Sequence, residues 1–84
     1  MRENNRYPRI RDLRENMDIN QTKMAKLLNM SQTGYSKYET GENDVPTAIL
    51  IKMARIHNVS VDYILGETDI RDRYPRSKNN IDLQ

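Results

Sequence analysis

Polar side chains suited to hydrogen bonding with the edges of nucleic-acid bases gather at residues 32–37. They are Gln32, Thr33, Ser36 and Lys37. The Gln amide and the Thr and Ser hydroxyls both donate and accept hydrogen bonds, which is what recognition of base edges requires. A helix face that serves only solubility usually carries Glu, Lys and Arg instead. We therefore predict that this surface reads bases, and the alternative is an ordinary solvated face.

These side chains share one face of a short helix that we predict over residues 32–39. Ser31 could cap its start, because its side-chain oxygen can accept a hydrogen bond from an amide that a helix start leaves unpaired. Tyr35 lies on the opposite, inward face. Tyr38 could lie there too, or it could reach a phosphate.

A second short helix is predicted immediately before the first. Asn20 could cap its start, and Met24, Ala25 and Leu28 follow at the spacing of a buried stripe. Asn29 ends it, because asparagine tolerates the left-handed backbone conformation that a sharp turn needs. Two helices joined so closely form a helix-turn-helix.

Gly34 stands inside the helix predicted over residues 32–39 and should cost about 1 kcal/mol relative to alanine. We interpret it as the mark of a close approach. The missing side chain would let Ala25 of the preceding helix pack tightly, or would bring the backbone near another surface. The alternative is that glycine is simply tolerated at this position.

Three further helices are predicted from apolar residues at helical spacing between capping residues. They cover about residues 8–17, 46–58 and 60–66. Together with the first two they form a compact all-α domain of five helices over residues 8–66. This domain is the part of the chain that must hold the polar face in position.

Length and composition exclude several kinds of function. A chain of 84 residues buries only about 60% of its unfolded surface, which leaves no room for a deep substrate cavity. There is no cysteine, which fits a reducing compartment, and no apolar run long enough to span a membrane. The one histidine, His57, lacks partners for a metal or catalytic site. We predict a cytoplasmic protein that is not an enzyme and binds no metal or cofactor.

Both ends of the chain are polar, and the net charge of +2 is by itself weak support for a nucleic-acid partner. Residues 1–7 are predicted to be a flexible arm, whose Arg2 and Arg6 could reach DNA or have no role. Residues 67–84 are predicted to be a polar tail with little fixed structure, apart from a short helix near residues 69–73. The tail could contact a subunit or a second protein, or have no role.

Several short motifs resemble the phage-repressor type of helix-turn-helix, the Cro/CI or XRE-type proteins. They are Gln21-x-x-x-Ala25, Asn29-Met30-Ser31, Tyr35-Ser36 and Glu39-x-Gly41, within a likeness that covers about residues 9–69. The chain departs from that family at Asn29, where glycine is more common. It also departs at the acidic segment 42–44, where many relatives carry basic residues that touch phosphate.

The resemblance implies a lambda-repressor-like fold and a sequence-specific transcriptional regulator, most often a repressor, with the helix at 32–39 in the major groove of double-stranded DNA. The base-reading residues would be Gln32, Thr33, Ser36 and Lys37. The phosphate-binding residues would be Asn20, Gln21, Tyr38 and Arg14. The resemblance also implies that Arg14 can form an ion pair with Glu39. Phosphate binding and this ion pair both stay open as roles for Arg14.

In the resembled family the last helix commonly pairs two subunits. We therefore expect a homodimer on a palindromic operator, with Val61, Tyr63 and Ile64 at the dimer interface and the recognition helices about 34 Å apart. A different alternative is an antitoxin or adaptor, whose protein partner would bind the last helix or the tail at 67–84. A controller of a restriction system would share the fold and the DNA role.

Overall fold

Five helices follow one another in the part of the chain that this computed structural model describes, residues 6–73. They are α1 (Pro8–Asn16), α2 (Gln21–Leu27), α3 (Gln32–Thr40), α4 (Thr47–His57) and α5 (Val61–Leu65). No strand occurs among the described residues, which confirms the prediction of an all-α fold of five helices. Residues 1–5 and 74–84, most of the predicted arm and tail, lie outside the described residues.

Polar side chains fix where three of the helices begin. Asn20, Ser31 and Ser60 each accept a hydrogen bond from the backbone N–H three residues later, at 2.8 to 3.0 Å. These bonds satisfy amides that the first turn of a helix leaves without an intrahelical partner. The predicted starts of α2, α3 and α5 are therefore confirmed.

Left-handed residues turn the chain between helices. Asn29 adopts a φ value of 59°, as the sequence predicts, and Asn58 and Gly66 adopt 57° and 82° at the ends of α4 and α5. Asp18 adopts φ 60° in the turn between α1 and α2. That turn was not predicted, because an aspartate among charged residues is also typical of an ordinary surface position.

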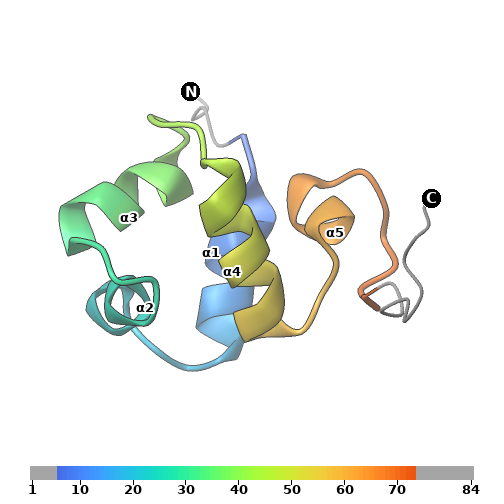
Figure 1. Ribbon diagram of the computed structural model, residues 1–84, viewed down its shortest axis with the longest axis horizontal. Coiled ribbons are helices and arrows are strands. Elements are labelled where there is room, and N and C mark those ends of the chain that lie inside the picture. Colours follow the sequence, from blue (N-terminus) through green and yellow to red (C-terminus); the bar gives the residue numbers. More distant parts are fainter. Residues whose placement is uncertain (1–5, 74–84) are drawn as a thin grey trace.

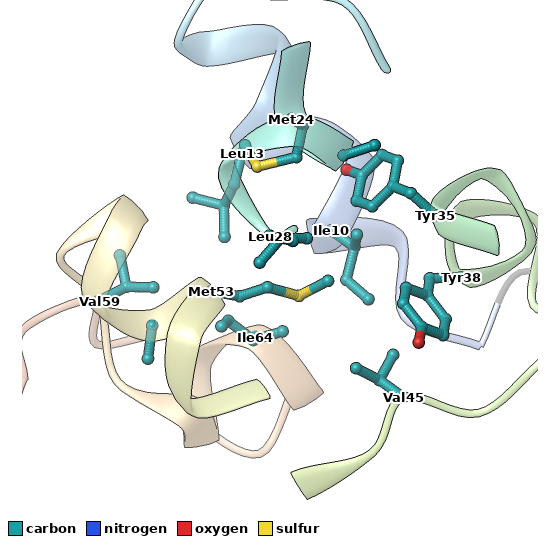
Figure 2. Packing of buried hydrophobic residues seen from close by; sticks show 12 residues of the cluster. Ile10, Leu13, Met24, Leu28, Tyr35, Tyr38, Val45, Met53, Val59 and Ile64 are labelled. Carbon is teal, nitrogen blue, oxygen red and sulfur yellow. The ribbon is translucent and has the colours of Figure 1, made fainter. Parts of the chain in front are cut away.

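Helix α1 lies at the centre of the arrangement and packs against both α3 and α5, while α2 packs on α3 and α4 on α5 (Figure 1). Figure 2 shows side chains from all five helices meeting in one core. The largest fully buried side chains are Tyr35, Ile10, Met24, Leu28, Met53, Ile64 and Val59. The core therefore packs against the inner face of α3 and leaves the outer face of this helix uncovered.

The close approach at Gly34 lies within its own helix start. A Cβ atom added there would lie 3.1 Å from the terminal methyl carbon of Met30 and 3.1 Å from the hydroxyl oxygen of Ser31. No atom of Ala25 comes within 4 Å of that position, so the explanation through α2 is wrong. Glycine instead leaves room for the capping hydroxyl and for the methionine before it.

Residues 66–73, which follow α5, contain no helix and are tied to the rest of the domain. The Arg9 guanidinium donates hydrogen bonds to the carbonyl oxygens of Tyr63 at 2.8 Å and Thr68 at 2.6 Å. The Ser60 N–H donates to the carbonyl of Arg71 at 3.0 Å. The short helix predicted near residues 69–73 is wrong, because no helix occurs there and the bonds from Arg9 and Ser60 hold this segment along the domain.

Candidate nucleic-acid interface

The outer face of α3 carries the four side chains that the sequence predicts as base readers. Gln32 and Thr33 are exposed, and Ser36 and Lys37 are half-buried. Positions three and four residues apart on a helix lie next to one another on its surface, so these four side chains form one patch. Ser31 caps the start of this helix, and Tyr35 anchors it in the core from the opposite side.

A chain of hydrogen bonds runs from α1 to this patch, and we call its four members, Arg14, Glu39, Gln21 and Gln32, the Glu39 network. Arg14 donates to both carboxylate oxygens of Glu39, from Nε to Oε2 at 2.6 Å and from Nη2 to Oε1 at 3.2 Å. Gln21 Nε2 donates to Glu39 Oε1 at 2.9 Å. Gln32 Nε2 donates to Gln21 Oε1 at 2.7 Å. The buried ion pair thereby sets the orientation of an exposed amide on α3.

The charged centre of the Glu39 network is buried but fully partnered. Glu39 is 5% exposed and Arg14 is 9% exposed. A third nitrogen of Arg14, Nη1, donates to the carbonyl of Ile19 at 2.8 Å. Burial alone would raise the pKa of Glu39, but hydrogen bonds from Arg14 and Gln21 outweigh it and hold the pKa below its ordinary value. Glu39 is therefore a carboxylate at neutral pH.

This lowered pKa predicts a loss of stability in acid. A glutamate in an unfolded chain titrates near pH 4.3, so the stability that Glu39 contributes is present above about that pH and is lost as pH falls through the folded pKa. We expect the free energy of unfolding, measured with urea at a series of pH values, to decline below about pH 5. Glu39→Gln should be less stable at neutral pH and show a flatter decline. An identical decline in Glu39→Gln would contradict this account.

Two of the four predicted phosphate-binding residues face solvent. Asn20 is exposed and uses its side-chain oxygen as the cap of α2, which leaves its Nδ2 group free for an anion. Gln21 is half-buried, and one of its two amide hydrogens goes to Glu39. Both residues stand at the start of α2, and Gln21 is bonded directly to the α3 patch through Gln32.

The other two predicted phosphate-binding residues, Arg14 and Tyr38, lie in the interior of the domain. Arg14 has the ion pair with Glu39 that was one of its two alternatives, and its bonds leave it little surface for a phosphate. Tyr38 is 8% exposed, its ring meets that of Tyr35 edge to face at 6.3 Å, and Figure 2 shows it beside Val45. Both side chains are buried, and this argues against the phosphate role predicted for them.

Two of the three residues predicted for a dimer interface remain partly exposed, and the third is buried. Val61 and Tyr63 are half-buried on α5, but Ile64 is 1% exposed. Ile64 cannot take part in an interface in this conformation, because α5 turns it into the core of its own subunit. The Tyr63 ring is also covered by the guanidinium groups of Arg9, at 4.0 Å from the ring centre, and Arg71, at 5.3 Å.

The bond between Gln21 and Gln32 was not predicted from the sequence. Each glutamine is the first residue of its helix, directly after a capping residue, and that shared position is the one signal that could have suggested a pairing. Residues 6–73 contain no group of three or more acidic, histidine or cysteine side chains that could hold a metal ion. No helix within this range has the length and apolar character needed to cross a bilayer.

Comparisons with known proteins place the chain among regulators. Residues 10–64 match a protein family described as Helix-turn-helix. The chain is 35% identical over 71 residues to the uncharacterized HTH-type transcriptional regulator YobD of Bacillus subtilis (strain 168), covering 84% of the chain and 63% of that protein. It is 32% identical over 75 residues to the HTH-type transcriptional regulator ImmR of the same organism, covering 89% and 55%.

A third relative, the SPbeta prophage-derived uncharacterized HTH-type transcriptional regulator YonR of the same organism, is 33% identical over 60 residues, covering 71% of the chain and 56% of that protein. The chain thus spans 55 to 63% of the length of these curated relatives. No solved structure matches it significantly.

Proposed function

Since this chain belongs to the XRE-type helix-turn-helix family of transcriptional regulators, we propose that it represses transcription by binding one DNA sequence with α3 in the major groove. The observation that carries this proposal is the Glu39 network. It gives an exposed amide on α3 a fixed orientation, which a merely solvated helix face does not need. Fixed donors and acceptors are what discrimination between bases requires.

Gln32 is the residue best placed to discriminate. One hydrogen of its Nε2 group is bonded to Gln21, which leaves the second hydrogen and the Oε1 acceptor for a base. This pair matches the N7 acceptor and N6 donor of adenine, and a good bidentate contact of this kind discriminates by about 1 to 3 kcal/mol. Lys37 would reach guanine, the Thr33 methyl would pack on thymine, and the Ser36 hydroxyl would bond either a donor or an acceptor.

Asn20 and Gln21 are the proposed phosphate contacts, through the amide hydrogens that their bonds within the protein leave free. Contacts of this kind position a protein on the duplex without reading its sequence. We propose no phosphate contact for Arg14 or Tyr38, because both side chains are buried in the interior.

The protein would bind as a homodimer on a palindromic operator. Two copies of α3 must stand about 34 Å apart to enter successive turns of the major groove. Val61 and Tyr63 on α5 remain the proposed contacts between subunits, without Ile64. Arg9 and Arg71 already lie on the Tyr63 ring, so the segment after α5 would form part of this interface.

Selection of bound duplexes from a random pool tests the proposal. We expect the selected sequences to converge on one motif that contains adenine and is repeated with twofold symmetry at a spacing of about one helical turn. A convergent motif without symmetry would argue against the dimer alone. A pool that stays random at physiological salt would contradict sequence-specific binding and favour the adaptor alternative.

A further inference from the structure

Arg6 and Tyr7, the two residues just before α1, are held against the loop that follows α3. Arg6 Nη1 donates to Asp44 Oδ1 at 2.7 Å, and the Tyr7 hydroxyl donates to the same oxygen at 3.4 Å. Both charged side chains remain open to solvent, with 45% of Arg6 and 69% of Asp44 exposed. Figure 1 shows the start of the coloured chain, just before α1, near the loop between α3 and α4. The pair is therefore accessible to a competing ion.

Two contacts hold Asp44 close to the end of α3. The N–H of Asn43 donates to the carbonyl of Lys37 at 3.1 Å, which folds the loop back onto the last turns of that helix. Val45, the next residue after Asp44, is 9% exposed and packs in the core near Tyr38 (Figure 2). Asp44 is thus fixed between two anchored residues, with its carboxylate outside the core and near the C-terminal end of α3.

A negative charge at this place opposes DNA binding. A helix that lies in the major groove is flanked by phosphates on both sides, so charges just beyond its end face one of the two strands. Asp44 would repel that strand, and Arg6 would attract it. While the two are paired, their charges cancel and the arginine is withheld from the DNA.

We propose that Arg6 is a further phosphate-contacting residue and that Asp44 limits its use by binding the same guanidinium in the free protein. A carboxylate and a phosphate are recognised by a guanidinium through the same geometry, so they compete for it. An exposed ion pair contributes little to stability, and the exchange is therefore easy. This inference rests on the proposed DNA-binding function.

Asp44→Asn tests the inference by removing the competitor. We expect the variant to bind a fluorescent duplex, selected from a random pool with the original protein, about fivefold more tightly at about 0.1 M salt. The plot of log affinity against log salt should become steeper by about 0.9, the value for one added phosphate contact. An unrelated duplex of equal length should show a similar gain, because phosphate contacts carry no sequence information.

Glu42→Gln is the matched control, because it removes one negative charge from the same loop and the structure shows no bond from Glu42 to Arg6. It should give a clearly smaller gain. Repeating both changes in an Arg6→Gln background separates competition from simple repulsion. If Asp44 sequesters Arg6, the effect of Asp44→Asn should shrink to that of Glu42→Gln in this background.

Three outcomes would overturn the inference. They are an Asp44→Asn gain no larger than that of Glu42→Gln, an equal gain with and without Arg6, and a loss of affinity in Asp44→Asn. Thermal unfolding of each variant checks that the exposed substitutions leave the fold intact. If the unaltered protein selects no duplex at all, the proposed function has failed, and that result is distinct from these three.

Discussion

Glu39→Ala should lower the free energy of unfolding by about 3 to 5 kcal/mol, because it leaves the guanidinium of Arg14 buried without its partner. Glu39 accepts two hydrogen bonds from Arg14, and both side chains are buried. A small domain has a total stability of about 5 to 15 kcal/mol, so the variant should be close to unfolding. Urea denaturation followed by circular dichroism at neutral pH measures the effect.

The exposed pair of Arg11 and Glu15 is the matched control, since it lies on α1 like Arg14 and joins Nε to a carboxylate oxygen at 3.0 Å. Its side chains are 60% and 51% exposed. Arg11→Ala, which removes this pair without altering a partner of Arg14, should therefore cost less than about 0.5 kcal/mol. A loss in Glu39→Ala as small as that in Arg11→Ala would show that the buried pair does not stabilise the fold.

Removing both partners gives a second check. The combined variant Arg14→Ala and Glu39→Ala should lose less stability than the sum of the two single losses, because no unpaired charge is left in the interior.

The same residues connect stability with recognition. Glu39 also binds the Gln21 amide that holds Gln32, so a change in the core would reach the α3 face without touching DNA.

The features that could be predicted from the sequence are those set by residues close together in the chain. Asn20, Ser31 and Ser60 cap the helices that they precede, because a side-chain oxygen needs only the amides of the next turn. Asn29 and Asn58 turn left-handed for a reason intrinsic to asparagine. The outward position of Gln32 and Thr33 likewise follows from helix periodicity.

The features that were left open or missed depend on how distant elements meet. Arg14 and Glu39 are far apart in sequence, and both an ion pair and a phosphate contact were consistent with an arginine on α1. Ile64 appeared available for a partner because the apolar residues of α5 outnumber the positions that one short helix buries. Nothing in the local pattern shows that Gln21 reaches Gln32, because the angle between α2 and α3 decides it.

Gln32→Ala and Gln21→Ala should affect DNA binding in different ways. Gln32→Ala removes the side chain proposed to bond adenine, so it should weaken binding to the selected duplex by about 1 to 3 kcal/mol and leave an unrelated duplex nearly unchanged. Gln21→Ala removes a proposed phosphate contact and should weaken binding to both duplexes. Titrations of the selected and the unrelated duplex at one salt concentration measure both effects.

The bond from Gln32 Nε2 to Gln21 Oε1 adds a further consequence. Without its acceptor the Gln32 amide can rotate, so Gln21→Ala should also relax the preference for adenine at the base pair that Gln32 reads. Duplexes altered at that base pair alone would show it as a reduced penalty. Thr22→Ala, at the exposed residue next to Gln21, should keep the full penalty. If Gln32→Ala and Gln21→Ala instead weakened all duplexes by one common factor, Gln32 would have no role in reading bases, and its orientation by the Glu39 network would be structural only.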